Sequence, residues 1–235
     1  MYKKAIRNKG GANKLEESLK KLRKPSVQVM NVLSLIMILL STTQYLFSLT
    51  LESTPIYLII TTLIEIIVIL LGLLQLFEKN NDNPLKKAKR YLIVGILTSY
   101  FTYLSFYNLY FFMAEENKYD LTKFWVVSFV FFLICSCAHI CSLLLMGNTP
   151  RWFKGDKTMW IIILKIIACT FYVQKIIEYI IIPNIVESHF LIILSMLMMF
   201  VSNLLVSHYY LLYGRVFTDF NKLSKDNRKR DGVNK

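Results

Sequence analysis

Six long apolar runs constrain the fold of this 235-residue chain more than any other feature. Each approaches or exceeds the roughly 20 residues that an α-helix needs to cross the hydrocarbon core of a bilayer. The runs lie at approximately 27–50, 56–77, 91–113, 124–146, 159–182 and 190–213. None shows the strict alternation of a barrel strand. The sequence therefore predicts an all-α, polytopic integral membrane protein with six transmembrane helices packed as a bundle.

Lysines and arginines are concentrated in alternate connections between these runs. Nine precede residue 25, five lie in 78–90, three lie in 147–158 and seven follow Gly214, whereas 52–55 and 183–189 contain none and 114–123 contains two. Basic connections resist translocation across a membrane, so they stay on the cytoplasmic side. We therefore expect both termini to be cytoplasmic, in a plasma membrane or a bacterial cytoplasmic membrane.

The net charge of +13 is explained by this membrane arrangement. The excess of basic residues lies beside the apolar runs, where it would attract anionic lipid headgroups, and nucleic acid is not an expected partner. Only 18% of the residues are charged, against about one-quarter in soluble domains. We expect a basic cytoplasmic segment at 1–24, a transmembrane domain at 25–213 and a basic cytoplasmic tail at 214–235.

Local signals place the helix boundaries and one further helix. Residues 13–24 carry leucines at 15, 19 and 22, which share one face of a helix. This amphipathic helix is expected to lie along the cytoplasmic membrane surface, with docking to a protein partner as the alternative. Pro183 is expected to stop the fifth span and Gly214 to end the sixth. Trp125 is expected at the membrane–water interface, which indole rings favour.

Ionisable residues at membrane depth predict the candidate site. Glu65 lies about ten residues, and Lys175 about eight, from the outer ends of their runs, so their depths agree within roughly 3 Å and a salt bridge between them is possible. Glu178 shares a helix face with Lys175. Tyr103 and Tyr107 belong to a row of tyrosines on one face, and buried phenol hydroxyls need partners. We predict a polar seam of Glu65, Tyr103, Tyr107, Lys175 and Glu178 that opens towards the outside.

Two roles for this seam remain open at the level of the sequence. A buried ion pair with tyrosine neighbours can fix the register of the helices and contribute little net stability. The same groups can instead bind a ligand or carry a transported ion, because charged groups inside a membrane are costly to keep.

Cysteines and a histidine are clustered in the fourth run, at positions 135, 137, 139 and 141. On a helix, the pairs 135/139 and 137/141 point in different directions, and the spacing matches no zinc pattern. No metal site and no cofactor are therefore predicted. Small apolar cysteines at helix contacts are the favoured interpretation, and thiol chemistry within the membrane is a minor alternative.

Motifs that would indicate catalysis are absent from the sequence. It contains no G-x-S-x-G, no phosphate-binding P-loop and no H-E-x-x-H. No run is broken by an internal proline, so the helices are expected to be continuous. The sequence favours a non-enzymatic interaction, regulatory or toxin-immunity-type membrane protein, with a protein partner at the outer loops or at the N-terminal helix. A small-solute or ion transporter, or the substrate-binding membrane subunit of one, is the alternative.

Overall fold

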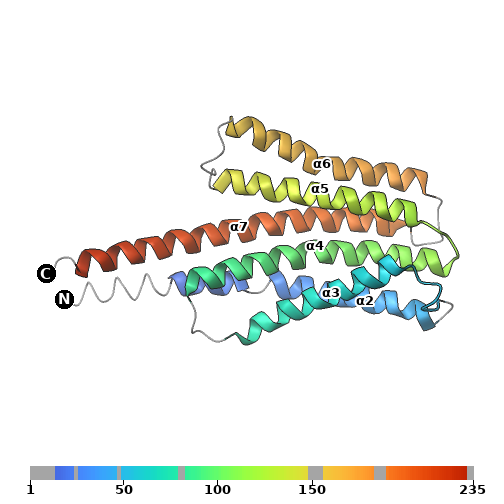
Figure 1. The fold of residues 1–235 in the computed structure, drawn as a ribbon, viewed down its shortest axis with the longest axis horizontal. Coiled ribbons are helices and arrows are strands. Elements are labelled where there is room, and N and C mark those ends of the chain that lie inside the picture. Colours follow the sequence, from blue (N-terminus) through green and yellow to red (C-terminus); the bar gives the residue numbers. More distant parts are fainter. Residues whose placement is uncertain are drawn as a thin grey trace.

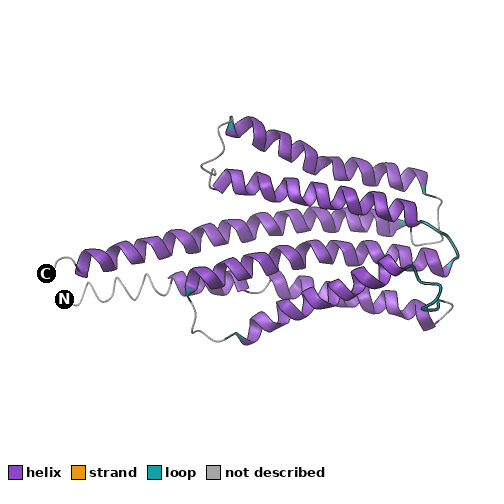
Figure 2. Cartoon of the chain, in the orientation of Figure 1, coloured by secondary structure: helices purple, strands orange, loops and turns teal. Residues whose placement is uncertain are grey.

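The computed structural model describes residues 14–23, 26–46, 49–78, 83–147, 156–182 and 189–231. All the regular elements in these ranges are helices, which confirms the all-α prediction (Figure 2). The long helices are α2 (Ser26–Thr43), α3 (Ile56–Leu74), α4 (Pro84–Glu116), α5 (Thr122–Gly147), α6 (Lys157–Ile181) and α7 (Phe190–Asp231). Short 3₁₀ turns, Gln44–Leu46 and Gln75–Phe77, extend α2 and α3. Six helices of the described residues are long and apolar enough to cross a membrane.

The helices form an antiparallel bundle with α4 and α7 side by side through its centre (Figure 1). The pair α2 and α3 packs on one side of α4, and the pair α5 and α6 lies on the opposite side (Figure 1). We call the end of the bundle with the turns 49–55 and 117–121 the loop end. The opposite end, where α2 begins and α5 finishes, is the terminal end.

Helix α4 is the core of this arrangement. Of its apolar stretch 72% is buried, against 17% for α6. Small side chains allow its close contacts with α2 and α7. The Ser34 hydroxyl donates to Thr102 Oγ1 at 3.0 Å, and the Ser202 hydroxyl donates to the Ser99 carbonyl at 2.6 Å. Small and hydroxylated residues are typical of helix contacts inside membranes, because they let two backbones approach closely.

Capping residues start three of the helices. Asn83 accepts a hydrogen bond from the Leu85 amide at 3.0 Å, with Pro84 at the first helical position. Asp156 accepts from the Thr158 amide at 2.9 Å at the start of α6. Asp120 accepts from the Thr122 amide at 3.0 Å, and bonds from the Thr122 side chain and backbone lower the pKa of Asp120. Each of these side chains accepts from a backbone amide that the first turn of a helix leaves without an intrahelical partner.

The end of α4 is a Schellman motif with a lysine in place of the usual glycine. The Tyr119 amide donates to the Ala114 carbonyl at 2.9 Å, and the Lys118 amide donates to the Glu115 carbonyl at 2.9 Å. Lys118 has a φ of 63°, the left-handed conformation that glycine adopts most easily. This tight turn leads directly into the cap of α5.

The last helix does not end at Gly214, so the prediction that this glycine stops it is wrong. Helix α7 continues through Gly214 to Asp231, and Gly214 does not have a positive φ. Packing explains the continuation, since Val216 is fully buried in a cluster with Tyr91 of α4. The fifth-span boundary is confirmed only as far as the end of α6 at Ile181, since Pro183 lies outside the described residues.

The amphipathic N-terminal helix is confirmed over residues 14–23, but its leucine face is not free to contact a membrane surface. Leu22 is fully buried and Leu15 is 9% exposed, in the same cluster as Tyr91 and Val216. Arg23 donates to the Leu76 carbonyl, after α3. This helix therefore packs its leucine face on the terminal end of its own bundle.

Candidate functional site

The strongest polar feature of the core is an ion pair on α6. Lys175 Nζ lies 2.8 Å from Glu178 Oε2, and the two side chains are 0% and 1% exposed. Their separation of three residues places them on one face of the helix. Helix α6 turns this face towards α4 and α5, so both charges lie inside the bundle.

Tyr107 of α4 holds both members of the pair. Its hydroxyl donates to Glu178 Oε1 at 2.5 Å. The ammonium group of Lys175 lies 3.2 Å from the centroid of the Tyr107 ring, which is the geometry of a cation–π contact. One tyrosine thus uses its hydroxyl for the anion and its ring for the cation.

Two neutral side chains complete the bonding of the carboxylate. The Ser128 hydroxyl, from α5, donates to Glu178 Oε2 at 2.6 Å. Gln174 Nε2 donates to the same oxygen at 2.8 Å and to Ser128 Oγ at 2.7 Å. We call Tyr107, Ser128, Gln174, Lys175 and Glu178 the Glu178 cluster. A buried charge is tolerated when it is paired and hydrogen-bonded, and this carboxylate has one cation and three neutral donors.

Glu65 belongs to a second network, on the other side of α4. Asn108 Nδ2 donates to Glu65 Oε1 at 2.8 Å and to Thr61 Oγ1 at 3.0 Å. Asn108 Oδ1 accepts from the indole nitrogen of Trp125 at 2.9 Å. We call Thr61, Glu65, Asn108 and Trp125 the Glu65 cluster. Glu65 is 1% exposed, and its hydrogen-bond partner among the described residues is a neutral amide rather than a cation.

The structure brings together three of the five predicted seam residues. Tyr107, Lys175 and Glu178 are in direct contact. Lys175 is paired with Glu178 rather than with Glu65, so the suggested Glu65–Lys175 salt bridge is not formed. Tyr103 stacks on Tyr107 with ring centroids 6.0 Å apart, and its hydroxyl has no hydrogen-bond partner among the described residues. Tyr103 is therefore an aromatic neighbour of the Glu178 cluster.

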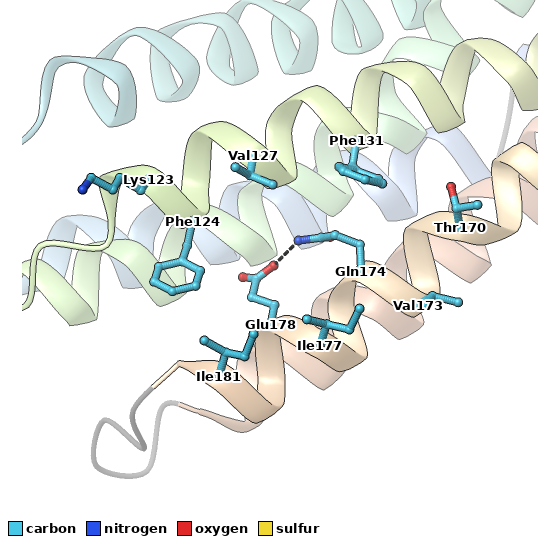
Figure 3. A pocket seen from close by; sticks show the side chains of 10 residues that line it. All are labelled: Lys123, Phe124, Val127, Phe131, Thr170, Val173, Gln174, Ile177, Glu178 and Ile181. Carbon is cyan, nitrogen blue, oxygen red and sulfur yellow. Dashed lines mark hydrogen bonds between the residues drawn. The ribbon is translucent and has the colours of Figure 1, made fainter.

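A groove of about 460 Å³ between α5 and α6 reaches one edge of the Glu178 cluster (Figure 3). Gln174 and Glu178 form part of its wall, and Lys123 lies at its loop end (Figure 3). The remaining lining is mostly apolar, with Phe131 and Val173 on facing helices. Lys175 does not line this groove and is 1% exposed.

Three of the residues that bond to the two glutamates were not predicted from the sequence. These are Asn108, Ser128 and Gln174, which are polar residues in apolar runs. Asn108 and Gln174 are adjacent in sequence to Tyr107 and Lys175, and Ser128 bonds to Glu178. Their presence at membrane depth was the available signal, because buried polar side chains need hydrogen-bond partners. Trp125 was expected at the interface, but it is 5% exposed and serves as a buried donor.

The cysteines of α5 do not form a common site. Cys135 is buried and its thiol bonds to the Ile167 carbonyl at 3.2 Å, whereas Cys137 and Cys141 are exposed. His139 Nε2 lies 3.2 Å from the Asn203 carbonyl of α7. Across the ranges that the structure describes, no three histidine, cysteine or acidic side chains gather as metal ligands would.

Fold and site together define a class of protein: an all-helical bundle whose six long helices are apolar enough to cross a membrane, with two buried glutamates beside its central helix. Residues 16–227 match a family model described as Domain of unknown function (DUF5079), and the chain belongs to this family. No curated protein and no solved structure matches the chain.

Proposed function

We propose that this chain is a non-enzymatic multi-pass membrane protein that acts by binding another protein, as an interaction, regulatory or toxin-immunity-type protein does. The terminal end faces the cytoplasm in a plasma membrane or a bacterial cytoplasmic membrane, and the loop end faces outwards. This orientation rests on the basic residues, which are concentrated in the segments that meet at the terminal end.

The observation that carries the proposal is the closed bonding of the Glu178 cluster. Charged side chains are costly to keep inside a membrane, and Lys175 and Glu178 neutralise each other at 2.8 Å. Tyr107 and Ser128 then occupy the carboxylate oxygens at 2.5 and 2.6 Å. A pair that is satisfied in this way acts as a fixed connection between α4, α5 and α6, and a rigid bundle offers its surface, rather than a moving interior, for function.

The loop end carries a surface suited to a protein partner. Leu51, Ile56 and Tyr119 are exposed at 72%, 73% and 44% in its turns and helix starts. Glu52 and Asp120 are exposed at the same end, and Asp120 stays charged to lower pH because its pKa is lowered. Exposed apolar and aromatic side chains with a charged rim are typical of protein-binding surfaces.

The test is a growth assay in which the full chain is produced together with each protein encoded beside its gene. We expect the chain to relieve the toxicity of one of these proteins, and we expect the double variant Leu51→Ala, Tyr119→Ala to lose that protection. Phe77→Ala is the matched control, because Phe77 is 79% exposed at the terminal end. Protection that survives the double variant but fails with Phe77→Ala would contradict a partner at the outer loops.

Transport of a small solute or ion is the second candidate, and one observation favours it. Glu65 is buried at 1% exposure and its hydrogen bond comes from the neutral Asn108 amide, so a proton or a cation could balance its charge. The test is flux through proteoliposomes that contain the purified chain, with ion- and pH-sensitive dyes inside. A flux that Glu65→Gln and Lys175→Met abolish in well-folded protein would replace the interaction proposal with transport.

A further inference from the structure

A second open site lies at the terminal end, between the last residue of α5 and the middle of α7. It is a pocket of about 540 Å³. Its lining includes Gly147, Tyr210, Gly214, Arg215 and Asp219. None of these residues belongs to the Glu65 or Glu178 cluster, and the inference below does not depend on the proposed function.

Gly214 is the first reason to assign a ligand to this pocket. A Cβ atom at Gly95 would lie 2.9 Å from the ring of Tyr209, and one at Gly147 would lie 2.7 Å from the hydroxyl of Tyr210, so tight packing explains both glycines. At Gly214 an added Cβ would meet nothing within 4 Å among the described residues. Gly214 does not need a positive φ either, and glycine weakens a helix interior. Neither packing against the described residues nor backbone geometry accounts for this glycine, whereas a ligand lying against the bare backbone would.

The charged residues of the pocket are the second reason. Arg215 is exposed, and Asp219 lies one helical turn further on, at a spacing that often forms a salt bridge. Lys21 and Glu17 do form such a bridge at 2.7 Å, but Arg215 and Asp219 are not among the salt bridges of the described residues. Within the described part of the chain, the guanidinium of Arg215 and the carboxylate of Asp219 thus have no ion-pair partner, and Tyr210 lines the same pocket.

The depth of the pocket indicates what would fill it. Gly214 lies about 36 Å along α7 from Phe190, and Gly147 lies about 38 Å along α5 from Thr122, by the rise of an α-helix. A hydrocarbon core of about 30 Å ends before both glycines, which places them at the level of the lipid headgroups. Leu211 also lines the pocket, almost one turn nearer the hydrocarbon, and is 64% exposed. Towards the end of the bundle, the lining of the pocket therefore changes from apolar to charged, as a lipid molecule changes from acyl chain to headgroup.

We propose that this pocket binds the headgroup of one glycerophospholipid whose head carries a hydrogen-bond donor. The phosphate pairs with Arg215, which offers a planar fork of N–H groups suited to phosphate oxygens. The ammonium or hydroxyl of the headgroup donates to Asp219. The glycerol backbone lies against Gly214, and an acyl chain passes Leu211 into the bilayer.

The full chain in nanodiscs of defined composition tests this assignment. The discs contain phosphatidylethanolamine, phosphatidylglycerol or phosphatidylcholine. Native mass spectrometry then counts the lipids that stay bound after the protein is gently released from the disc. We expect the unaltered chain to retain one ethanolamine or glycerol lipid in preference to the choline lipid, whose head has no donor. Arg215→Gln should lower retention about tenfold for every lipid, and Asp219→Asn should remove only the preference between heads.

Two further variants separate the pocket from general attraction to a basic surface. Gly214→Leu fills the open space, and the helix content should be unchanged because leucine favours a helix; lipid retention should be lost. Lys222→Gln removes an exposed basic residue two turns beyond Arg215 and should leave retention unchanged. Equal losses for Lys222→Gln and Arg215→Gln, or full retention in Gly214→Leu, would overturn the proposal. Release of the lipid by millimolar inorganic phosphate would also overturn it, in favour of a free-phosphate site.

Discussion

The Glu178 and Glu65 clusters bury the same acidic side chain to nearly the same extent, at 2% and 1% exposure, and satisfy it differently. Glu178 has a cation 2.8 Å away and three neutral donors, from three helices. Glu65 has the Asn108 amide at 2.8 Å and no cation paired with it among the described residues. Tyr107 and Asn108 are consecutive residues of α4, so the two clusters lie on different sides of one helix.

This difference indicates which buried charge contributes to the stability of the bundle. In the Glu178 cluster, side chains from α4, α5 and α6 all bond to one carboxylate. Removing one charge of the ion pair therefore leaves the other charge buried without its partner. In the Glu65 cluster, the amide of Asn108 connects a carboxyl, a hydroxyl and an indole, none of which is a cation. The first cluster should be intolerant of single charge removals, and the second should tolerate them.

Replacing Lys175 by methionine should have the largest effect. The carboxylate of Glu178 would remain buried without its cation, and breaking a buried pair in this way costs about 3–5 kcal/mol of folding free energy. The measurement is denaturant or thermal unfolding of the purified protein in a fixed detergent. Lys165→Met is the control, because Lys165 is exposed on the same helix. This variant should unfold under the same conditions as the unaltered protein.

A double replacement sharpens the same comparison. Lys175→Met together with Glu178→Gln removes both charges, so most of the stability lost in the single variant should return. If the double variant is as unstable as Lys175→Met alone, the charges do not act as a pair and the account of the Glu178 cluster given above is wrong.

Tyr107→Phe probes a single hydrogen bond of the Glu178 cluster. It removes the hydroxyl that donates to Glu178 at 2.5 Å and keeps the ring beside Lys175. Hydrogen bonds to charged groups contribute about 1.5–3 kcal/mol, and we expect a loss in that range by the same unfolding measurement. Tyr103→Phe is the matched control, since the Tyr103 hydroxyl has no hydrogen-bond partner among the described residues. Equal losses of stability in the two variants would show that the hydrogen bond from Tyr107 to Glu178 does not stabilise the protein.

The sequence predicted the helices better than their contacts, and the two glutamates show why. Lys175 and Glu178 share one helix, so their spacing alone places them together. Glu65 and Lys175 lie on different helices, and counting residues from a helix end gives depth but not the direction in which a side chain points. Their depths agree, yet α3 and α6 lie on opposite sides of α4 (Figure 1).

Gly214 shows a second limit of reasoning from the sequence. Glycine after an apolar run is a sound sign of a helix end, but it is a local sign. Here Val216, two residues later, is fully buried against the N-terminal helix and α4. That long-range packing favours the continued helix, and nothing in the local sequence around Gly214 contains this information.

The Glu65 cluster provides the third prediction, a contrast within one network. Asn108→Ala leaves the indole N–H of Trp125 and the carboxyl of Glu65 without a partner, which should cost about 1–3 kcal/mol for each stranded group. Glu65→Gln keeps a side chain of the same shape that can still accept from Asn108, so it should change stability by less than about 1 kcal/mol. Unfolding of both variants in the same detergent is the measurement. A loss from Glu65→Gln as large as that from Lys175→Met would mean that Glu65 has an ionic partner, and the contrast between the clusters would fail.

The smallest expected effect concerns the turn that follows both clusters on α4. Lys118 adopts a φ of 63° in the Schellman motif, so Lys118→Gly should relieve strain and stabilise the protein by up to about 1 kcal/mol. Glycine also has more freedom in the unfolded chain, which offsets part of this gain. Because Lys118 is exposed and has no hydrogen bond to either cluster among the described residues, the shift should be the same in the unaltered protein and in the Lys175→Met and Asn108→Ala variants. A shift that differs between those two backgrounds would couple the turn to one cluster, and the clusters could then no longer be treated as separate structural units on α4.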